Sequence, residues 1–228
     1  MKYFFISTSL IIIFSLQTKA QIQKGAILLG GSISFNSQDN NLDRLASGVS
    51  FLDENETDFL SLQPQAGIFV SESLLLGIGL KYEYQYIKDA DYREGNATNF
   101  FSNKANLTLY NAYIQKFFKL TDNFFFSPTL NVFLGSGTRE IRGTFTNRDG
   151  DLSAFEIELT PGLTYFVSEK WAATARIGEL YYRRLKDEKE ITSALSTEEE
   201  NVGKVYGLNF GLNSFAVGVR YFLRNNPE

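Results

Sequence analysis

The stretch LQPQAGIFVSESLLLGIGLKYEYQY, from Leu62 to Tyr86, alternates apolar and polar residues on both sides of a short turn at Ser71-Glu72-Ser73. After the turn, one face collects Leu74, Leu76, Ile78, Leu80, Tyr82, Tyr84 and Tyr86, and the other collects Gly77, Gly79, Lys81, Glu83 and Gln85. A period of two predicts a β-hairpin. An apolar face ending in tyrosines, opposite a face of glycine and charge, is typical of a lipid-facing barrel strand with a polar interior.

The same unit recurs along the chain. LTPGLTYFVSEKW, Leu159 to Trp171, lies 97 residues after LQPQAGIFVSESL, Leu62 to Leu74, and shares six of its 13 positions. FFKLTDNFFFSPTL, Phe117 to Leu130, is a looser third copy. Repeated strand-turn-strand units favour one closed antiparallel sheet over separate domains.

The connections between the expected strands alternate in length. Besides the two strands of the hairpin above, strands are expected at Lys24–Phe35, Lys104–Phe118, Phe124–Thr138, Phe155–Val167, Trp171–Tyr182 and Val205–Leu223. Turns of about three to five residues alternate with polar segments of roughly 12 to 22 residues at Asn36–Thr57, Lys88–Asn103, Arg139–Asp151 and Leu185–Gly203. This predicts an all-β fold, an eight-stranded antiparallel up-and-down transmembrane β-barrel with short periplasmic turns and long outer loops.

Irregularities are expected within these strands. Leu107 and Leu109 fall out of phase with the apolar residues that follow them, which predicts a bulge. Three prolines stand inside expected strands, where proline cannot donate a ladder hydrogen bond: Pro64, Pro128 and Pro161. We expect bulges there that help the sheet curl.

The amino-acid composition excludes several kinds of functional site. The 228-residue chain has no cysteine and no histidine, which excludes disulfides, the usual zinc sites and catalytic schemes that need histidine. A net charge of −4 does not indicate a basic surface that could bind nucleic acid. The 12 tyrosines and 21 phenylalanines suit an aromatic belt at a membrane interface. We expect no enzyme activity, no cofactor and no metal site.

Residues 1–20 have the pattern of a secretory signal peptide. Lys2 precedes an apolar run from Tyr3 to Leu16, and Ala20 is the small residue at the exit. The run is shorter than the roughly 18 to 20 apolar residues of a spanning helix. We therefore expect export across the inner membrane, a barrel over residues 21–228 and a location in the cell outer membrane.

Several phrases resemble the outer-membrane β-barrel-domain family, small barrels common in Bacteroidota. The phrases are Lys24–Ala26, Leu29–Ser32, Pro64–Leu80, Tyr110–Gly137, Pro161–Gly178 and Gly218–Phe222. The resemblance implies a small eight-stranded barrel of OmpA- or OmpX-like architecture, delivered by the barrel-assembly machinery, with no catalytic residues to transfer. Such chains usually end on an aromatic residue, whereas here six residues follow Phe222.

Six charged residues fall on the inward faces of the expected strands: Lys81, Glu83, Glu156, Glu158, Arg176 and Arg220. An ion path or a catalytic carboxylate pair is one interpretation. A salt-bridged interior is the favoured one, because an eight-stranded barrel is only wide enough for its own side chains and buried charges need partners. Glu156 and Glu158 lie two apart on one face and repel each other unless Arg176 or Arg220 lies between them. Removing Arg176 should then leave a carboxylate unpaired.

Acidic residues gather in the expected outer segments: Asp53, Glu54, Glu56, Asp58, Asp89, Asp91, Glu94 and Glu198–Glu200. Carboxylate oxygens suit calcium or magnesium, but the spacing matches no ordered ligand set, which favours solvated loops.

Three classes of function remain. The favoured one is a monomeric structural barrel whose charged outer loops contact surface partners, lipid or lipopolysaccharide. The alternatives are a small pore or solute-binding barrel and, ranked last, a lipid-modifying enzyme. A soluble periplasmic lipocalin-like ligand binder would place the apolar face inside instead.

Overall fold

The computed structural model describes residues 22–46, 49–93, 96–144, 147–189, 200–209 and 215–223. They form one sheet of 13 strands, in which every pair of neighbours is antiparallel. The strands are β1 (Ile27–Ala46), β2 (Val49–Ser71), β3 (Leu74–Arg93), β4 (Asn96–Lys116), β5 (Phe118–Lys119), β6 (Phe124–Phe126), β7 (Thr129–Gly143), β8 (Asn147–Thr160), β9 (Gly162–Phe166), β10 (Trp171–Arg176), β11 (Glu179–Lys189), β12 (Glu200–Asn209) and β13 (Ala216–Leu223).

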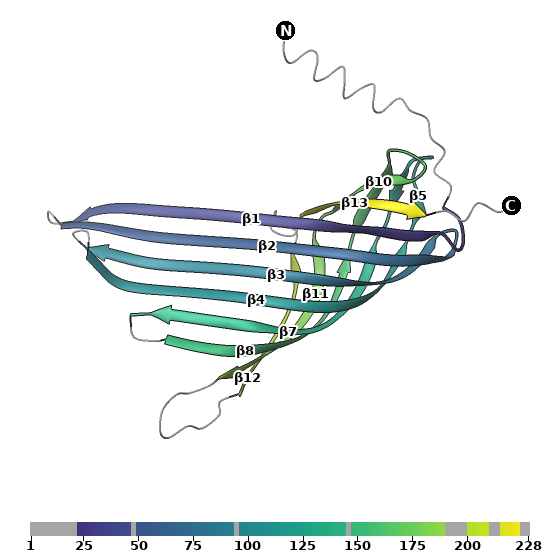
Figure 1. Cartoon of the computed structure of the whole chain (residues 1–228). Helices are drawn as coiled ribbons and strands as arrows, with labels where there is room; N and C mark the ends of the chain where they lie inside the picture. The colour runs from purple at the N-terminus through teal and green to yellow at the C-terminus, as the bar shows by residue number, and fades with distance from the viewer. Residues whose placement is uncertain are drawn as a thin grey trace, which may run out of the picture.

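The sheet runs in the order β12-β11-β8-β7-β4-β3-β2-β1-β13-β10-β9-β6-β5 and curls into a half-barrel (Figure 1). We call the end that holds the β2–β3 turn and the end of β13 the turn end, and the opposite end the hairpin end. The all-β, antiparallel up-and-down architecture is confirmed. The expected signal peptide lies outside the described residues, among which no helix is long and apolar enough to cross a membrane.

The structure divides the expected eight strands into thirteen. Phe117 separates β4 from β5, and Pro128 and Pro161 stand in the breaks between β6 and β7 and between β8 and β9. The other two divisions lie between Arg176 of β10 and Glu179 of β11, and between Asn209 of β12 and Ala216 of β13. A proline interrupts a ladder because it has no N–H to donate. Pairing resumes in the same register beyond the break, since Gln115 lies opposite Thr129 in one part and Phe118 opposite Phe126 in the next. The third proline, Pro64, remains inside β2 opposite Gly31.

The expectation of long outer loops is wrong for three of the four polar segments. β1 continues to Ala46 and pairs with β2 from Val49, and the β3–β4 and β7–β8 pairs extend in the same way. Figure 1 shows β1 to β4 extending furthest toward the hairpin end. We call the belt of outward apolar side chains, which includes Ile78, Tyr110 and Leu134, the apolar band. Beyond this band both faces of a strand can be polar, so the alternation disappears although the backbone pairing continues. Of the fourth segment, residues 190–199 lie outside the described residues.

Apolar side chains cover the outside of the sheet. Ile78 and Tyr110 are each 69% exposed, and Leu134 is 58% exposed. An outward apolar surface of this kind matches a lipid environment and not water.

The interior is partly apolar, contrary to the expected polar lining. At the turn end lies a buried group that we call the aromatic cluster: Ala26, Leu28, Phe69, Leu75, Tyr113, Phe117, Phe125, Phe166, Ala172 and Phe222. Its rings are in contact, with centroids 4.8 Å apart for Phe166 and Phe222 and 5.3 Å apart for Phe69 and Phe117.

Leu107 and Leu109 belong to a second interior cluster, with Phe133, Leu152 and Ala154. The bulge expected near these leucines is absent from β4, which pairs with β7 in one register from Phe101 to Gln115. The two leucines are out of phase with the outward residues because they point into the half-barrel.

Candidate functional site

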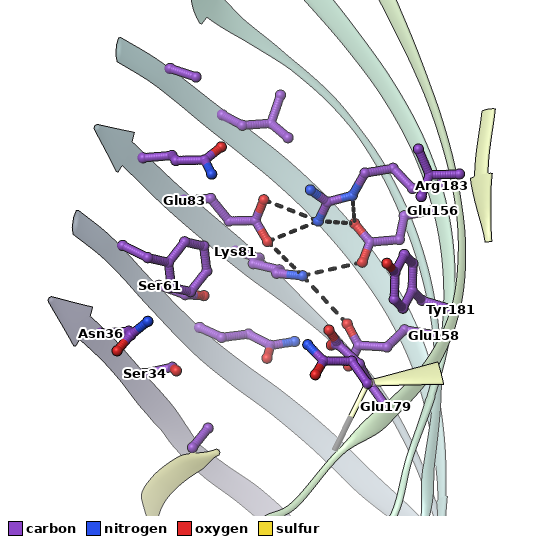
Figure 2. Close-up of a pocket in the computed structure, with 18 of the residues that line it drawn as sticks. Ser34, Asn36, Ser61, Lys81, Glu83, Glu156, Glu158, Glu179, Tyr181 and Arg183 are labelled. Atoms are coloured by element: carbon purple, nitrogen blue, oxygen red, sulfur yellow. Dashed lines mark hydrogen bonds and ion pairs between the residues drawn. The ribbon is translucent and has the colours of Figure 1, made fainter. Parts of the chain in front are cut away.

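A cavity of about 510 Å³ lies inside the half-barrel, between the aromatic cluster and the hairpin end. Its lining comes from strands on opposite walls. Figure 2 shows Lys81 and Glu83 on β3 reaching toward Glu156 and Arg183 on β8 and β11. Gln85, which also lines the cavity, is exposed, so the cavity opens toward the hairpin end.

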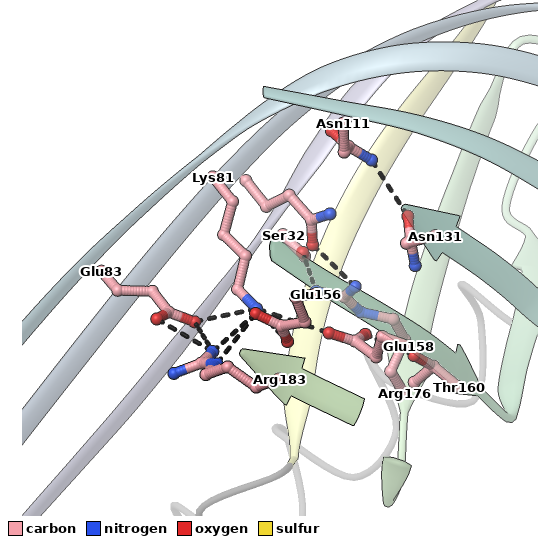
Figure 3. Close-up of polar contacts among 11 residues, drawn as sticks. Ser32, Lys81, Glu83, Asn111, Asn131, Glu156, Glu158, Thr160, Arg176 and Arg183 are labelled. Carbon is pink, nitrogen blue, oxygen red and sulfur yellow. Dashed lines mark hydrogen bonds and ion pairs between the residues drawn. The ribbon is translucent and has the colours of Figure 1, made fainter. Parts of the chain in front are cut away.

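Lys81 is the centre of a buried charge network (Figure 3). Its ammonium Nζ lies 2.8 Å from Glu83 Oε1 and 3.4 Å from both Glu156 Oε1 and Glu158 Oε2. The same nitrogen lies 4.6 Å from the centroid of the Phe133 ring. Lys81 therefore separates the two glutamates of β8, the position in which we expected Arg176 or Arg220.

Arg183 is the second cation of the network, and the sequence analysis missed it. Its Nη2 donates to Glu83 Oε1 and Oε2 at 3.1 Å and to Glu156 Oε2 at 2.7 Å, and its Nε donates to Glu156 Oε2 at 3.0 Å. The expected strand ended at Tyr182, and continuing its alternation by one residue would have placed Arg183 on the outward face.

Gly178 explains why Arg183 points inward. Its φ of 77° lies in the left-handed region that favours glycine. It separates β10 from β11 and changes the phase of the alternation, because Arg176 faces the interior before the break and Glu179, Tyr181 and Arg183 face it afterwards. A glycine between two alternating runs of opposite phase was the signal available in the sequence.

Arg176 and Arg220 lie inside the half-barrel but form no ion pair among the described residues. Arg176 donates from Nη1 to Gln63 Oε1 at 2.7 Å and from Nη2 to Ser32 Oγ at 2.5 Å. Arg220 donates to Gln115 Oε1 at 2.5 Å. The premise that removing Arg176 strands a carboxylate is therefore wrong, and Arg183 has that role.

Neutral polar side chains form a layer between the charge network and the aromatic cluster. Asn111 Nδ2 donates to Asn131 Oδ1 at 3.0 Å, and Gln115 Nε2 donates to the Ser127 carbonyl at 3.0 Å. Gln63 Nε2, which also belongs to this layer, is buried without a protein partner. Such groups need water or a ligand to complete their hydrogen bonds.

One acidic residue near the hairpin end, Glu54, forms a local ion pair. Glu54 Oε2 lies 3.0 Å from Lys88 Nζ, which raises the pKa of the lysine above its usual value through a charge-assisted hydrogen bond. Within the described ranges, no group of three or more acidic side chains is arranged to hold a metal ion. Glu94, Glu198 and Glu199 lie outside those ranges.

An antiparallel up-and-down sheet with an apolar outside and a charged inside defines an outer-membrane barrel protein. The chain belongs to the family of the outer membrane protein β-barrel domain, which matches residues 6–222. The resemblance stated from the sequence is confirmed, and the family consists of outer membrane proteins.

Among solved structures, the chain is similar to the outer membrane protein OprG from Pseudomonas aeruginosa, at a TM-score of 0.38 and 13% identity over 92% of this chain and 100% of that chain. No curated protein matches the chain.

Proposed function

We propose that this protein is a structural barrel of the outer membrane that presents polar hairpins to partners at the cell surface. The observation that carries the proposal is the continuation of β1 to β4 as polar, paired strands beyond the apolar band. Paired strands hold their side chains in a fixed register, so the hairpins offer a defined surface to lipopolysaccharide or to other surface molecules. The proposed role involves no catalysis.

In this proposal the thirteen strands form eight longer strands of one closed barrel, because β4 with β5, β6 with β7, β8 with β9, β10 with β11 and β12 with β13 each count as one interrupted strand. β1 to β4 pair in series, Phe117 joins β4 to β5, and β5, β6, β9, β10 and β13 pair in series back to β1. Phe117 N also donates to the Ser73 carbonyl at 2.8 Å, next to the β2–β3 turn. These contacts support a complete ring of neighbours at the turn end.

The direction of insertion follows from the same scheme. The turn end, with short connections, is the periplasmic side, and the hairpin end is the outer side. A signal peptide over residues 1–20 delivers the chain across the inner membrane, and the barrel-assembly machinery inserts it as a monomer.

The test is the gel mobility of the mature chain in outer-membrane fractions, with and without boiling, followed by conductance in planar bilayers. We expect a faster band without boiling, since a closed barrel resists detergent, and no steady conductance, since the aromatic cluster fills one end. The absence of a mobility shift, or a stable ohmic current, would contradict the proposal.

A solute-binding barrel is the second candidate, and the cavity of about 510 Å³ favours it. Ligand pockets typically have volumes of about 300 to 1,000 Å³. A continuous pore is disfavoured by the buried rings below the cavity, and a soluble lipocalin-like barrel by the apolar outside.

A further inference from the structure

The charged groups that line the cavity differ in one respect. Six of them form ion pairs within the protein: Lys81, Glu83, Arg139, Glu156, Glu158 and Arg183. Two others, Arg176 and Glu179, line the same cavity and form no ion pair with any described residue. The cavity therefore contains one cation and one anion that the protein does not neutralise by direct contact.

The Arg176 side of the cavity is rich in unused hydrogen-bond donors. Arg176 has five N–H groups, and only two neutral acceptors are bonded to it, Gln63 Oε1 and Ser32 Oγ. Gln63 is 2% exposed, lines the cavity and has no partner for its Nε2. Glu158 lies near this guanidinium, but its carboxylate accepts from Lys81 at 3.4 Å and from Thr160 at 2.5 Å. Spare donors on a guanidinium and a buried amide suit a carboxylate ligand.

The Glu179 side offers the opposite chemistry. Glu179 begins β11, immediately after Gly178, and its partly buried carboxylate accepts no hydrogen bond from a described residue. Figure 2 shows it below Glu158, on the wall that faces β3. An ammonium group placed there would gain a charged partner without breaking a contact of the network.

We propose that the cavity binds a small zwitterion, a free amino acid or a short peptide, with its carboxylate on Arg176 and Gln63 and its ammonium group on Glu179. This inference rests on the second function proposed above. Glu158 and Glu179 lie close enough to Arg176 to attract it, but neither carboxylate contacts the guanidinium. A ligand of one charge would give a direct partner to Arg176 or to Glu179 alone, whereas a zwitterion gives a direct partner to both in a partly buried site. Because the aromatic cluster lies below, the ligand enters and leaves by the hairpin end.

The experiment is calorimetric titration of the refolded full barrel in detergent with three related probes. L-alanyl-L-alanine carries both charges, its N-acetyl form lacks the ammonium group, and its C-terminal amide lacks the carboxylate. We expect the zwitterion to bind at least about tenfold more tightly than either blocked form. The proposal is overturned if none of the three binds, or if either blocked form binds as tightly as the zwitterion.

Two variants assign the ends of the ligand. Arg176→Gln should abolish the preference for a free over an amidated carboxyl end, and Glu179→Gln should abolish the preference for a free over an acetylated amino end. Asn36→Ala, at the hairpin-end rim of the same cavity, is the control and should keep both preferences. Loss of both preferences in the control would overturn the assignment. The mobility shift on boiling is measured for each variant, so that failure of the barrel is distinguished from failure of the site.

Discussion

Gly77 leaves the inner wall open for the Tyr113 side chain. A Cβ atom at Gly77 would overlap Cζ and Cε1 of the Tyr113 ring, and one at Gly67 would lie 2.8 Å from its hydroxyl. The ring therefore lies against two glycines of adjacent strands, at the edge of the aromatic cluster. Close approach, and not backbone flexibility, is what requires glycine at these positions.

Gly77→Ala should lower the free energy of unfolding by about 1 to 3 kcal/mol, because the ring must move within a packed interior. Urea unfolding of the refolded barrel measures this. Gly203→Ala is the matched control, since its added Cβ would meet only the Leu185 carbonyl at 3.8 Å, and it should change stability by less than about 0.5 kcal/mol. Equal effects of the two substitutions would contradict the close packing of Tyr113.

Arg183→Gln should lower the free energy of unfolding by about 2 to 3 kcal/mol, because Lys81 would then be the only cation paired with Glu83, Glu156 and Glu158. The neighbouring Arg184 is exposed and belongs to the other face of β11, so Arg184→Gln is the control and should be nearly neutral. The midpoints of urea unfolding for the two variants are compared directly. A loss of stability in the control as large as in Arg183→Gln would argue against a role for the buried network.

At the scale of the strand, the sequence predicts the strand segments inside the apolar band and does not predict their continuation beyond it. The alternation from Leu74 to Tyr86 identifies β3 because lipid demands one apolar face. From Lys88 to Arg93 the same strand continues without that demand, so its residues look like a loop. The charge network was predictable in composition, since Lys81, Glu83, Glu156 and Glu158 face inward. Its pairing was not, because the phase change at Gly178 determines which arginine reaches the glutamates.

The part of the β1–β2 hairpin that extends beyond the apolar band, residues 38–57, should be dispensable for folding. Replacing residues 38–57 by Asn-Gly would join Ser37 to Asp58, which already lie opposite each other. We expect the shortened protein to keep its mobility shift on boiling, because the apolar band and the aromatic cluster are untouched. It should lose binding to lipopolysaccharide vesicles, because the proposed surface has been removed. Retained binding would show that the proposed surface lies elsewhere, and loss of the mobility shift would show that the extension is needed for folding.

At the scale of the whole molecule, the single tryptophan reports the depth of insertion. Trp171 lies at the turn end, 47% exposed, with its ring 4.8 Å from that of Tyr221. Aromatic residues of this kind settle at the membrane interface. In vesicles of brominated lipids, bromines near the headgroups should quench Trp171 more strongly than bromines near the ends of the acyl chains.

A relocated tryptophan is the control for this measurement. The double variant Trp171→Phe and Ile78→Trp places the fluorophore in the middle of the apolar band, at a position that is 69% exposed. There the deeper bromines should quench more strongly. The same quenching profile for both proteins would contradict the placement of the band.

The aromatic cluster also constrains the order of folding. It combines Ala26 and Leu28 from the start of the described chain with Phe222 from its end, and Ile27 lies opposite Leu223. The cluster cannot form until β13 pairs with β1, so the apolar side chains of the earlier strands remain exposed until then. Contacts this distant in sequence slow folding. A chain truncated before β13 should therefore form no partial barrel, and its exposed apolar side chains should make it aggregate unless a periplasmic chaperone binds it.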